Sequence, residues 1–189
     1  MRLFVGVDLS EEVRRLVGQA AGDLRRKLGN TVDARWVPSE NMHLTVRFIG
    51  HVPDDGVSGL FELLTKPLDV APFDIELGGC GRFPPRGAPR VLWIGLTKGL
   101  QALSALHTEF NQRLAPLGHE PESKPFNAHL TLARVKDARA AGARTVDEAF
   151  QSIRISRVRQ RVEAMTVFES RMSPHGSKYS VLTHILLKS

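Results

Sequence analysis

The chain of 189 residues is 42% hydrophobic and 24% charged, the composition of an ordinary folded protein, which argues against intrinsic disorder. Its single cysteine, Cys80, excludes an internal disulfide, and the apolar run after Met1 is interrupted at Asp8, too short for a signal peptide or a membrane span. We therefore expect one domain over residues 1–189, cytoplasmic and not bound to a membrane. The net charge of +6 is compatible with a polyanionic partner.

The first elements predicted along the chain are a strand, a long helix and a short strand. Residues 3–9 form an apolar run typical of a buried strand. Ser10 suits a helix N-cap, and apolar residues at three- and four-residue spacing predict an amphipathic helix that ends near Leu28, where Gly29 can close it. Residues 34–37 are a short strand candidate that carries Trp36.

The next strand carries the first of two related motifs. Residues 42–49 are rich in β-branched and apolar side chains, which favours a strand. Alternation along a strand puts His43 and Thr45 on the same face. A helix is expected within residues 54–68 and a strand over 73–77, and the Gly- and Pro-rich residues 78–89 predict a loop.

The second motif lies eighty-six residues after the first and follows a similar order of elements. A strand over residues 91–96 and a helix over 98–117 lead to residues 128–135, where His129 and Thr131 repeat the pattern of the first motif. Each motif thus follows an apolar strand and a long amphipathic helix. We interpret the two sequence halves as a diverged repeat packed about a pseudo-two-fold axis, which would bring His43 and His129 together.

The end of the chain predicts a loop over 138–144, a short helix over 146–153 and an antiparallel pair of strands over 162–169 and 179–187. Arg157, Arg159 and Arg161 recur with period two and would share one face of a strand. That face has two open interpretations, contact with phosphates or plain solvation.

Two histidines and two hydroxyls in one cleft would suffice for acid–base chemistry without a metal. Histidine has an unperturbed pKa of about 6.5, so one imidazole can accept a proton near neutrality while the other donates one. Taken alone, either motif fits a half-buried strand residue bonded to a neighbour. The duplication favours a catalytic pair.

The motifs also carry a family resemblance. Residues 38–50, PSENMHLTVRFIG, and residues 126–134, FNAHLTLAR, resemble the 2H phosphoesterases, and the match is best to their RNA 2′,3′-cyclic phosphodiesterase branch, also called LigT-like or 2′-5′ RNA ligase. Residues 2–7, RLFVGV, and residues 168–170 with Tyr179 also fit that pattern. One departure is Ala128, where the family commonly has proline. The resemblance implies an α+β fold of two pseudo-symmetric lobes of antiparallel sheet with outer helices and the active cleft between them.

The resemblance also implies roles for the motif residues. His43 would donate a proton to the leaving 3′ oxygen, His129 would accept one from water, and the product would be a 2′-phosphate. Thr45 and Thr131 would hold phosphate oxygens, and Arg134 would be their cationic partner. Strict alternation puts Arg134 on the face opposite His129, so a bulge or strand end must turn it. Run backwards, the chemistry would join RNA ends through a 2′-5′ bond.

Other residues near the motifs are candidates for substrate contact. An aromatic ring beside a nucleotide cleft can stack on a base, and cationic side chains can contact phosphates. The candidates are Trp36, Phe48 and Tyr179 among the aromatic residues and Arg47 and Lys124 among the cations. The expected partner is an RNA or oligonucleotide that ends in a 2′,3′-cyclic phosphate, bound by a monomer.

Two other classes of protein are alternatives. A metal site would need further Asp, Glu, His or Cys ligands near the histidines, and neither motif supplies them, so we expect no metal and no cofactor. A non-catalytic RNA or nucleotide-binding module would need only the cleft and the basic charge, because a fold does not imply turnover.

Overall fold

The computed structural model describes residues 1–122, 125–138, 142–153, 158–173 and 176–188. Within them, nine strands form a sheet: β1 (Arg2–Asp8), β2 (Val32–Trp36), β3 (His43–His51), β4 (Phe73–Phe83), β5 (Val91–Lys98), β6 (Leu130–Ala138), β7 (Val158–Val162), β8 (Ala164–Ser173) and β9 (Gly176–Leu186). The α-helices are α1 (Glu11–Leu28), α2 (Val57–Leu64), α3 (Leu100–Leu114) and α4 (Gly142–Ser152).

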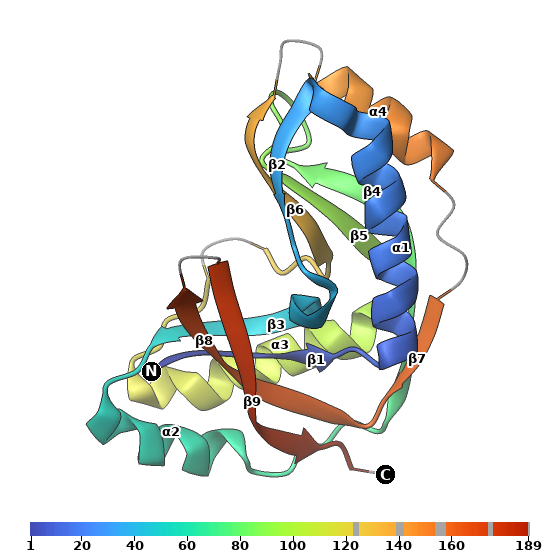
Figure 1. Cartoon of the computed structure of the whole chain (residues 1–189). Helices are drawn as coiled ribbons and strands as arrows, with labels where there is room; N and C mark the ends of the chain where they lie inside the picture. Colours follow the sequence, from blue (N-terminus) through green and yellow to red (C-terminus); the bar gives the residue numbers. More distant parts are fainter. Residues whose placement is uncertain (123–124, 139–141, 154–157, 174–175, 189) are drawn as a thin grey trace.

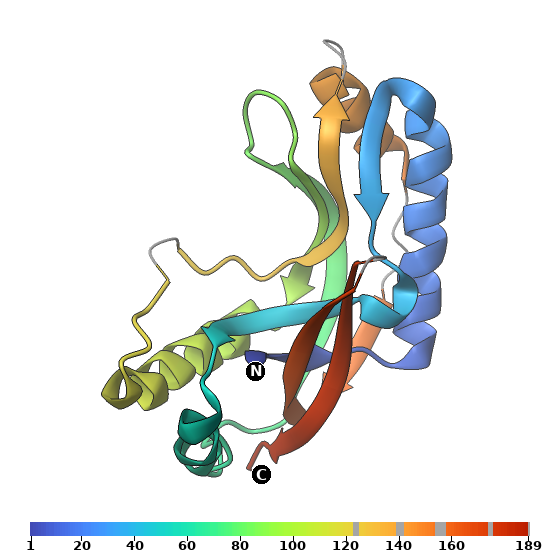
Figure 2. The ribbon, with the colours of Figure 1, turned by 60° about the vertical axis from the view of Figure 1, so that its left-hand side comes forward.

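The sheet consists of two halves that meet at the motif strands. Its strand order is β7-β4-β5-β6-β3-β1-β8-β9, with β2 paired to β6 beside this path, and the pairings between named strands are antiparallel. The halves join where Leu44 of β3 pairs with Leu130 of β6. Figures 1 and 2 show them turned steeply against each other, so that the sheet curls. The predicted α+β class is confirmed, and the two predicted lobes are the halves of one continuous sheet.

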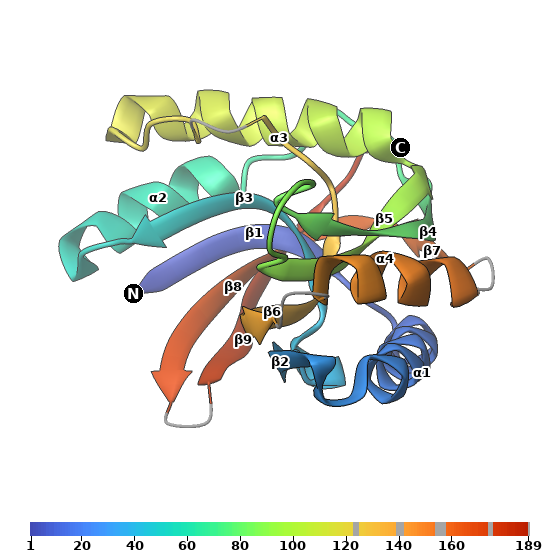
Figure 3. The ribbon, with the colours of Figure 1, turned by 90° about the horizontal axis from the view of Figure 1, so that it is seen from above.

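The helices lie on the outside of the two halves. Seen from above, α2 and α3 lie on one side of the sheet and α1 and α4 on the other (Figure 3). The predicted caps hold α1: the Ser10 hydroxyl accepts a hydrogen bond from the backbone N–H of Val13, and Gly29 leaves the helix with φ +50°. The buried face of α1 and its capping residues could be predicted because both depend on neighbouring residues in the sequence.

The glycine-rich segment before the first proline pair is strand, where we expected a loop. β4 continues to Phe83 because Gly81 pairs with Trp93 of β5, whose indole ring covers the glycine. A Cβ on Gly81 would lie 2.2 Å from that ring, so the sequence of β4 leaves room for its neighbour. The connection between β4 and β5 is therefore confined to residues 84–90.

The second difference concerns the chain after the second motif. The predicted loop over 138–144 is wrong at both of its described ends, because Ala138 closes β6 and α4 already begins at Gly142. Two basic residues of β7 are ion-paired with β4: Arg159 with Glu76 and Arg161 with Asp74. Their carboxylate partners argue against the phosphate-contacting interpretation of this face. Arg157, the third residue of the predicted basic face, lies outside the described residues.

Candidate active site

One cavity of about 490 Å³ collects the histidines and threonines of both motifs. It lies where β2, β3 and β6 approach the β8–β9 hairpin. Leu44 and Leu130 pair antiparallel at its base, so the two motifs run past each other in opposite directions and each histidine comes beside the threonine of the other motif. The remaining lining residues are Arg2, Phe4, Arg35, Val37, Asn41, Phe48, Arg134, Ser170, Met172, Ser177 and Tyr179.

A β-bulge in β3 decides which side chain follows the first motif into the cavity. The register against β1 passes from Thr45 to Arg47 over one extra residue, Val46. This shifts the alternation, so Phe48 lines the cavity and Arg47 turns to the opposite face. Arg47 is only 2% exposed and donates hydrogen bonds to the backbone carbonyls of Phe48, at 2.9 Å, and of His119, at 3.3 Å. The prediction that Arg47 contacts substrate is wrong.

An equivalent bulge lies in β6. Its register against β5 passes from Thr131 to Ala133 over Leu132. The shift brings Arg134 onto the cavity face with Thr131. Strict alternation would place Arg134 on the opposite face, and this bulge is the irregularity that we expected to turn it. Arg134 and Phe48 are therefore equivalent positions of the two motifs, each five residues after its histidine. The repeat extends beyond the four motif residues to the backbone irregularity that follows them.

Both imidazoles are held in the same way. His43 Nδ1 lies 2.9 Å from the carbonyl oxygen of Asn41, and His129 Nδ1 lies 2.7 Å from the carbonyl oxygen of Asn127. A carbonyl only accepts, so each Nδ1 carries the proton and donates it, and in the neutral ring Nε2 is the free acceptor. On His43 this Nε2 lies 3.1 Å from the hydroxyl of Thr45. The two backbone carbonyls thus fix one tautomer at both positions.

Burial keeps both rings neutral in the unliganded site. Desolvation lowers the pKa of His43 from 6.5 to about 4, against a smaller raising effect of the hydrogen bond to the Asn41 carbonyl. Desolvation also lowers the pKa of His129, and the positive charge of Arg134 acts in the same direction. At neutral pH each histidine is therefore a proton acceptor until an anion enters the cavity.

Aromatic side chains pack around each histidine. The ring centroids of Phe4 and Tyr179 lie 4.6 and 4.8 Å from that of His43. On the other side of the site, the ring of Phe83 lies 5.1 Å from His129 in an edge-to-face arrangement. Tyr179 was expected near the site, whereas Phe83 lay in a predicted loop and had no signal to mark it. These contacts account for the desolvation of both rings.

Cationic side chains surround the rest of the cavity. Arg134 and Arg35 lie directly opposite each other on β6 and β2, and both line it. Arg2 also lines the cavity, with its guanidinium 5.0 Å from the centre of the Phe48 ring. Arg35 and Arg2 were missed by the sequence analysis, although the alternation of β2 would have shown that Arg35 faces opposite to Trp36. Three guanidinium groups give the cavity the charge to hold a phosphate.

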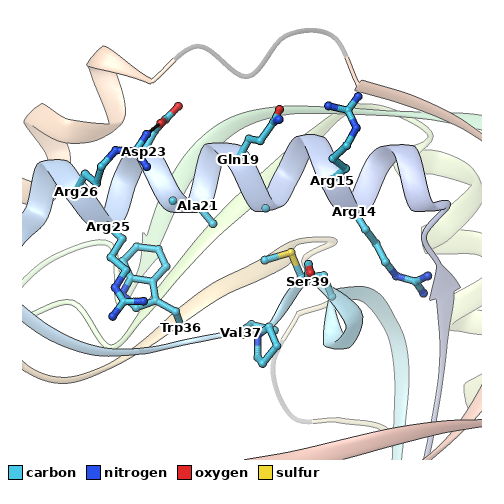
Figure 4. Close-up of a pocket in the computed structure, with 14 residues that line it drawn as sticks. Arg14, Arg15, Gln19, Ala21, Asp23, Arg25, Arg26, Trp36, Val37 and Ser39 are labelled. Atoms are coloured by element: carbon cyan, nitrogen blue, oxygen red, sulfur yellow. Dashed lines mark hydrogen bonds and ion pairs between the residues drawn. The ribbon is translucent and has the colours of Figure 1, made fainter.

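Two remaining candidates lie elsewhere. Trp36 points away from the histidines, because its neighbours Arg35 and Val37 occupy the cavity face of β2; it lines a different cavity beside α1 (Figure 4). Its predicted place in the cleft is therefore wrong. Lys124 lies outside the described residues.

The described part of the chain shows neither a metal-ligand cluster nor a membrane-spanning helix. Within it, no three His, Cys, Asp or Glu side chains come together as a metal site. No described helix combines the length and the apolar character needed to cross a membrane.

Comparison with known proteins identifies the family of the chain. Residues 7–171 match the model of the 2′-5′ RNA ligase superfamily. The chain belongs to that superfamily. Within it, a curated protein of Thermotoga maritima named RNA 2′,3′-cyclic phosphodiesterase is 30% identical over 96% of this chain and 93% of its own length. A protein of the same name from Archaeoglobus fulgidus is 36% identical over 72% of this chain and 73% of its own.

Solved structures share the fold of this chain. The protein TT0787 of Thermus thermophilus superimposes with a TM-score of 0.78 at 28% identity and covers 99% of this chain and 98% of its own. LigT of Escherichia coli, solved in a complex with 3′-AMP, has a TM-score of 0.76 at 23% identity and covers 100% and 98%. The superfamily membership and LigT-like fold expected from the two motifs are confirmed.

Proposed function

We propose that the protein hydrolyses RNA 2′,3′-cyclic phosphate ends to 2′-phosphates. The observation that carries this proposal is the pair of equivalent imidazoles, each with Nδ1 on a backbone carbonyl, in one cavity with two threonine hydroxyls and three arginines. Curated relatives that share the superfamily are named RNA 2′,3′-cyclic phosphodiesterase, which supports the same reaction. The reaction requires one proton acceptor and one proton donor on opposite sides of a phosphate, and the site offers both.

His129 is the proposed base. Its Nε2 takes a proton from a water molecule as the water oxygen attacks phosphorus and the bond from phosphorus to O3′ breaks. The lowered pKa keeps this imidazole neutral, and therefore able to accept a proton, at neutral pH. The carbonyl of Asn127 stabilises the imidazolium that forms, because it accepts a hydrogen bond from Nδ1 in both charge states.

His43 is the proposed acid. Its Nε2–H gives a proton to O3′ as that oxygen leaves, so phosphate remains on O2′ and the ring of the cyclic ester opens. Because its pKa is about 4 in the empty site, His43 is neutral there at neutral pH, and it must take up a proton from solvent when the substrate binds. An anionic phosphate beside Nε2 favours the charged imidazolium and raises this pKa. After one turnover His129 holds a proton and His43 has lost one, so exchange with solvent resets the pair.

The remaining cavity residues have proposed roles in binding. Thr45 and Thr131 donate hydroxyl hydrogen bonds to the non-bridging phosphate oxygens, and Arg134 neutralises their developing charge. Phe48 and Tyr179 offer ring surfaces for the terminal nucleoside. The same two proton transfers in reverse would join a cyclic phosphate end to a 5′-hydroxyl through a 2′-5′ bond.

The oligomeric state and location of the protein stay predictions. Every residue assigned a role above comes from one chain, which supports action as a monomer. We expect it to act on RNA ends in the cytoplasm.

Turnover of a short RNA that ends in a 2′,3′-cyclic phosphate tests the proposed function. The assay compares the wild type, His43→Ala and His129→Ala in excess chelator and identifies the phosphate isomer by phosphorus NMR. We expect the wild type to form only 2′-phosphate and each variant to lose at least ~100-fold in kcat, the usual contribution of an acid or base. A wild type that binds this RNA without converting it would instead establish a non-catalytic binding module, and loss of turnover on chelation would establish a metal requirement.

A further inference from the structure

A second cavity, of about 630 Å³, lies on the other face of β2 from the histidines. It is a groove between α1 and the segment that leads from β2 to β3 (Figure 4). We call it the α1–β2 groove and define it by Arg14, Gly18, Gly22, Arg25, Trp36 and Ser39. The chemistry assigned to the active site uses none of these residues.

One face of α1 forms a wall of the groove. Arg14, Gly18, Gly22 and Arg25 follow one another at spacings of four, four and three residues, which places them along one stripe of the helix. The two glycines have no side chain, so the middle of the stripe stays open between the arginines at its ends. Glycine within a helix costs about 1 kcal/mol relative to alanine. Helix stability therefore does not account for the open middle.

The groove is positively charged. Four arginines line it, at positions 14, 15, 25 and 26, against one acidic residue, Asp23. Arg14 is ion-paired with Asp8, and Arg26 is ion-paired with Asp23. Arg15 and Arg25 make no ion pair within the residues that the structure describes. Arg25 extends from α1 toward Trp36 of β2 (Figure 4).

Trp36 supplies an aromatic surface beside that unpaired cation. Its ring is half-buried against the core, which holds it in place, and it also lines the groove. A fixed aromatic ring next to a guanidinium suits a nucleotide, because the ring stacks on the base and the cation binds the phosphate. An acidic peptide would use the cation but not the flat ring.

The groove and the active site are neighbours. Val37 lines both cavities, so a chain that leaves the active site over this residue enters the groove. At the near end of the groove, Arg14 is close enough to His43 to lower its pKa electrostatically. A ligand longer than one nucleotide can therefore occupy both cavities.

We propose that the α1–β2 groove binds the single-stranded RNA on the 5′ side of the cyclic phosphate, with Trp36 stacked on a base and Arg25 on a backbone phosphate. The direction follows from chemistry, since the cyclic phosphate is the 3′ end and the rest of the RNA lies on its 5′ side. This inference rests on the proposed function and adds a substrate class to it: RNA strands of several nucleotides in preference to cyclic mononucleotides.

Kinetics on substrates of increasing length test the groove. The series runs from a nucleoside 2′,3′-cyclic phosphate to RNAs of two, four and eight nucleotides with the same 3′ end. The wild type should show a lower KM as length increases, whereas Trp36→Leu and Arg25→Gln should each lose about tenfold of that gain, within the range for one base–aromatic stack. Turnover of the cyclic mononucleotide should be equal in all three proteins. Equal KM values at every length would overturn the proposal.

Two matched controls separate the groove from general effects. Lys66→Gln removes one exposed positive charge just after α2, at a residue that lines neither cavity, and should leave the length dependence intact. Gly18→Leu fills the groove without changing its charge and should abolish the length dependence, while Gly59→Leu, at an open position of α2, should not. A Gly18→Leu protein with the length dependence of the wild type would contradict the inference.

A binding measurement keeps this inference separate from the proposed activity. The protein has two tryptophans, so Trp93→Phe leaves Trp36 as the sole indole fluorophore. An eight-nucleotide RNA ending in a 2′-phosphate should quench this fluorescence, and a nucleoside 2′-phosphate should not. Quenching in this variant, with no turnover by the wild type, would retain the groove and reject the phosphodiesterase; turnover by the wild type without quenching in the variant would do the reverse.

Discussion

Arg35 and Arg134 lie directly opposite each other across the β2–β6 pair, and both guanidinium groups line the cavity that holds the two histidines. Like charges at directly opposite positions of a sheet destabilise it. A phosphate between or beside them would relieve that repulsion. The pair therefore destabilises the empty protein and stabilises its complex with a bound anion.

Arg35→Gln should consequently stabilise the empty protein and weaken its response to phosphate. We expect the free energy of unfolding to increase by about 0.2 to 1 kcal/mol, because the cross-strand repulsion is removed. The increase in melting temperature on adding inorganic phosphate should be smaller than in the wild type. Thermal unfolding with and without phosphate measures both effects, and Lys66→Gln is the control for loss of one charge. A larger phosphate response in Arg35→Gln would refute this account of the pair.

The lowered pKa values of the histidines predict an acidic optimum for the free enzyme. The profile of kcat/KM reports groups of the free enzyme, where His43 has a pKa of about 4 and the pKa of His129 is also lowered. The reaction needs one ring protonated and one neutral, so the optimum of kcat/KM should fall below about 6.5, the unperturbed value. The bound phosphate raises both pKa values, so the optimum of kcat should lie at a higher pH. Coincident optima at or above about pH 7 would contradict the burial argument.

Arg47 and Arg134 follow the two bulges and should have opposite mutational effects. Arg47→Met leaves three part-buried backbone carbonyls without their donor and should lower the free energy of unfolding by about 2 to 3 kcal/mol. Arg134→Met alters an exposed side chain and removes the repulsion with Arg35, so it should raise the free energy of unfolding by about 0.2 to 1 kcal/mol while it lowers kcat/KM. Urea denaturation and kinetics on the two proteins form a matched comparison. Loss of stability in Arg134→Met with full activity would mean that the bulge in β6 does not aim this side chain at the substrate.

The packing of Gly81 under Trp93 connects β4 to the second histidine. A Cβ at position 81 would lie 2.2 Å from the indole, whose ring is 6.2 Å from that of His129. Gly81→Ala should therefore displace the indole, cost about 1 to 3 kcal/mol of stability as an overpacked site, and lower kcat. Trp93→Phe should restore part of both losses in the double variant. Gly59→Ala, where nothing lies within 4 Å, is the control.

The elements of the fold were readable because their signals are local. Ser10 and Gly29 bound α1, and the repeated motif predicted two strands that meet. The two bulges were not readable, since Val46 and Leu132 are ordinary strand residues and the extra residue is visible only against the neighbouring strand. For this reason Arg47 was named as a candidate for phosphate contact although it lies on the opposite face, whereas Arg134 was named through the family resemblance.

Tertiary contacts determined the other residues that sequence reasoning misplaced. The glycines of β4 stay in a strand because side chains of β5 cover them. Trp36 was expected beside the histidines, but the face of β2 that carries it is turned toward α1. The position of that helix, which the sequence of β2 does not reveal, decides which face of β2 lines the active site. Local propensity carries no information about either relationship.

A substrate whose leaving group needs no proton tests most directly which histidine is the acid and which is the base. In 3′-deoxyadenosine 2′-(4-nitrophenyl phosphate), nitrophenolate departs from the side where O3′ would leave, and water attack still yields a 2′-phosphate. His43→Ala should hydrolyse this ester within about tenfold of the wild-type rate, because no acid is required, while His129→Ala should remain at least ~100-fold slower because the water still needs a base. Equal losses in both variants, or rescue of His129→Ala alone, would contradict the assignment of His43 as acid and His129 as base.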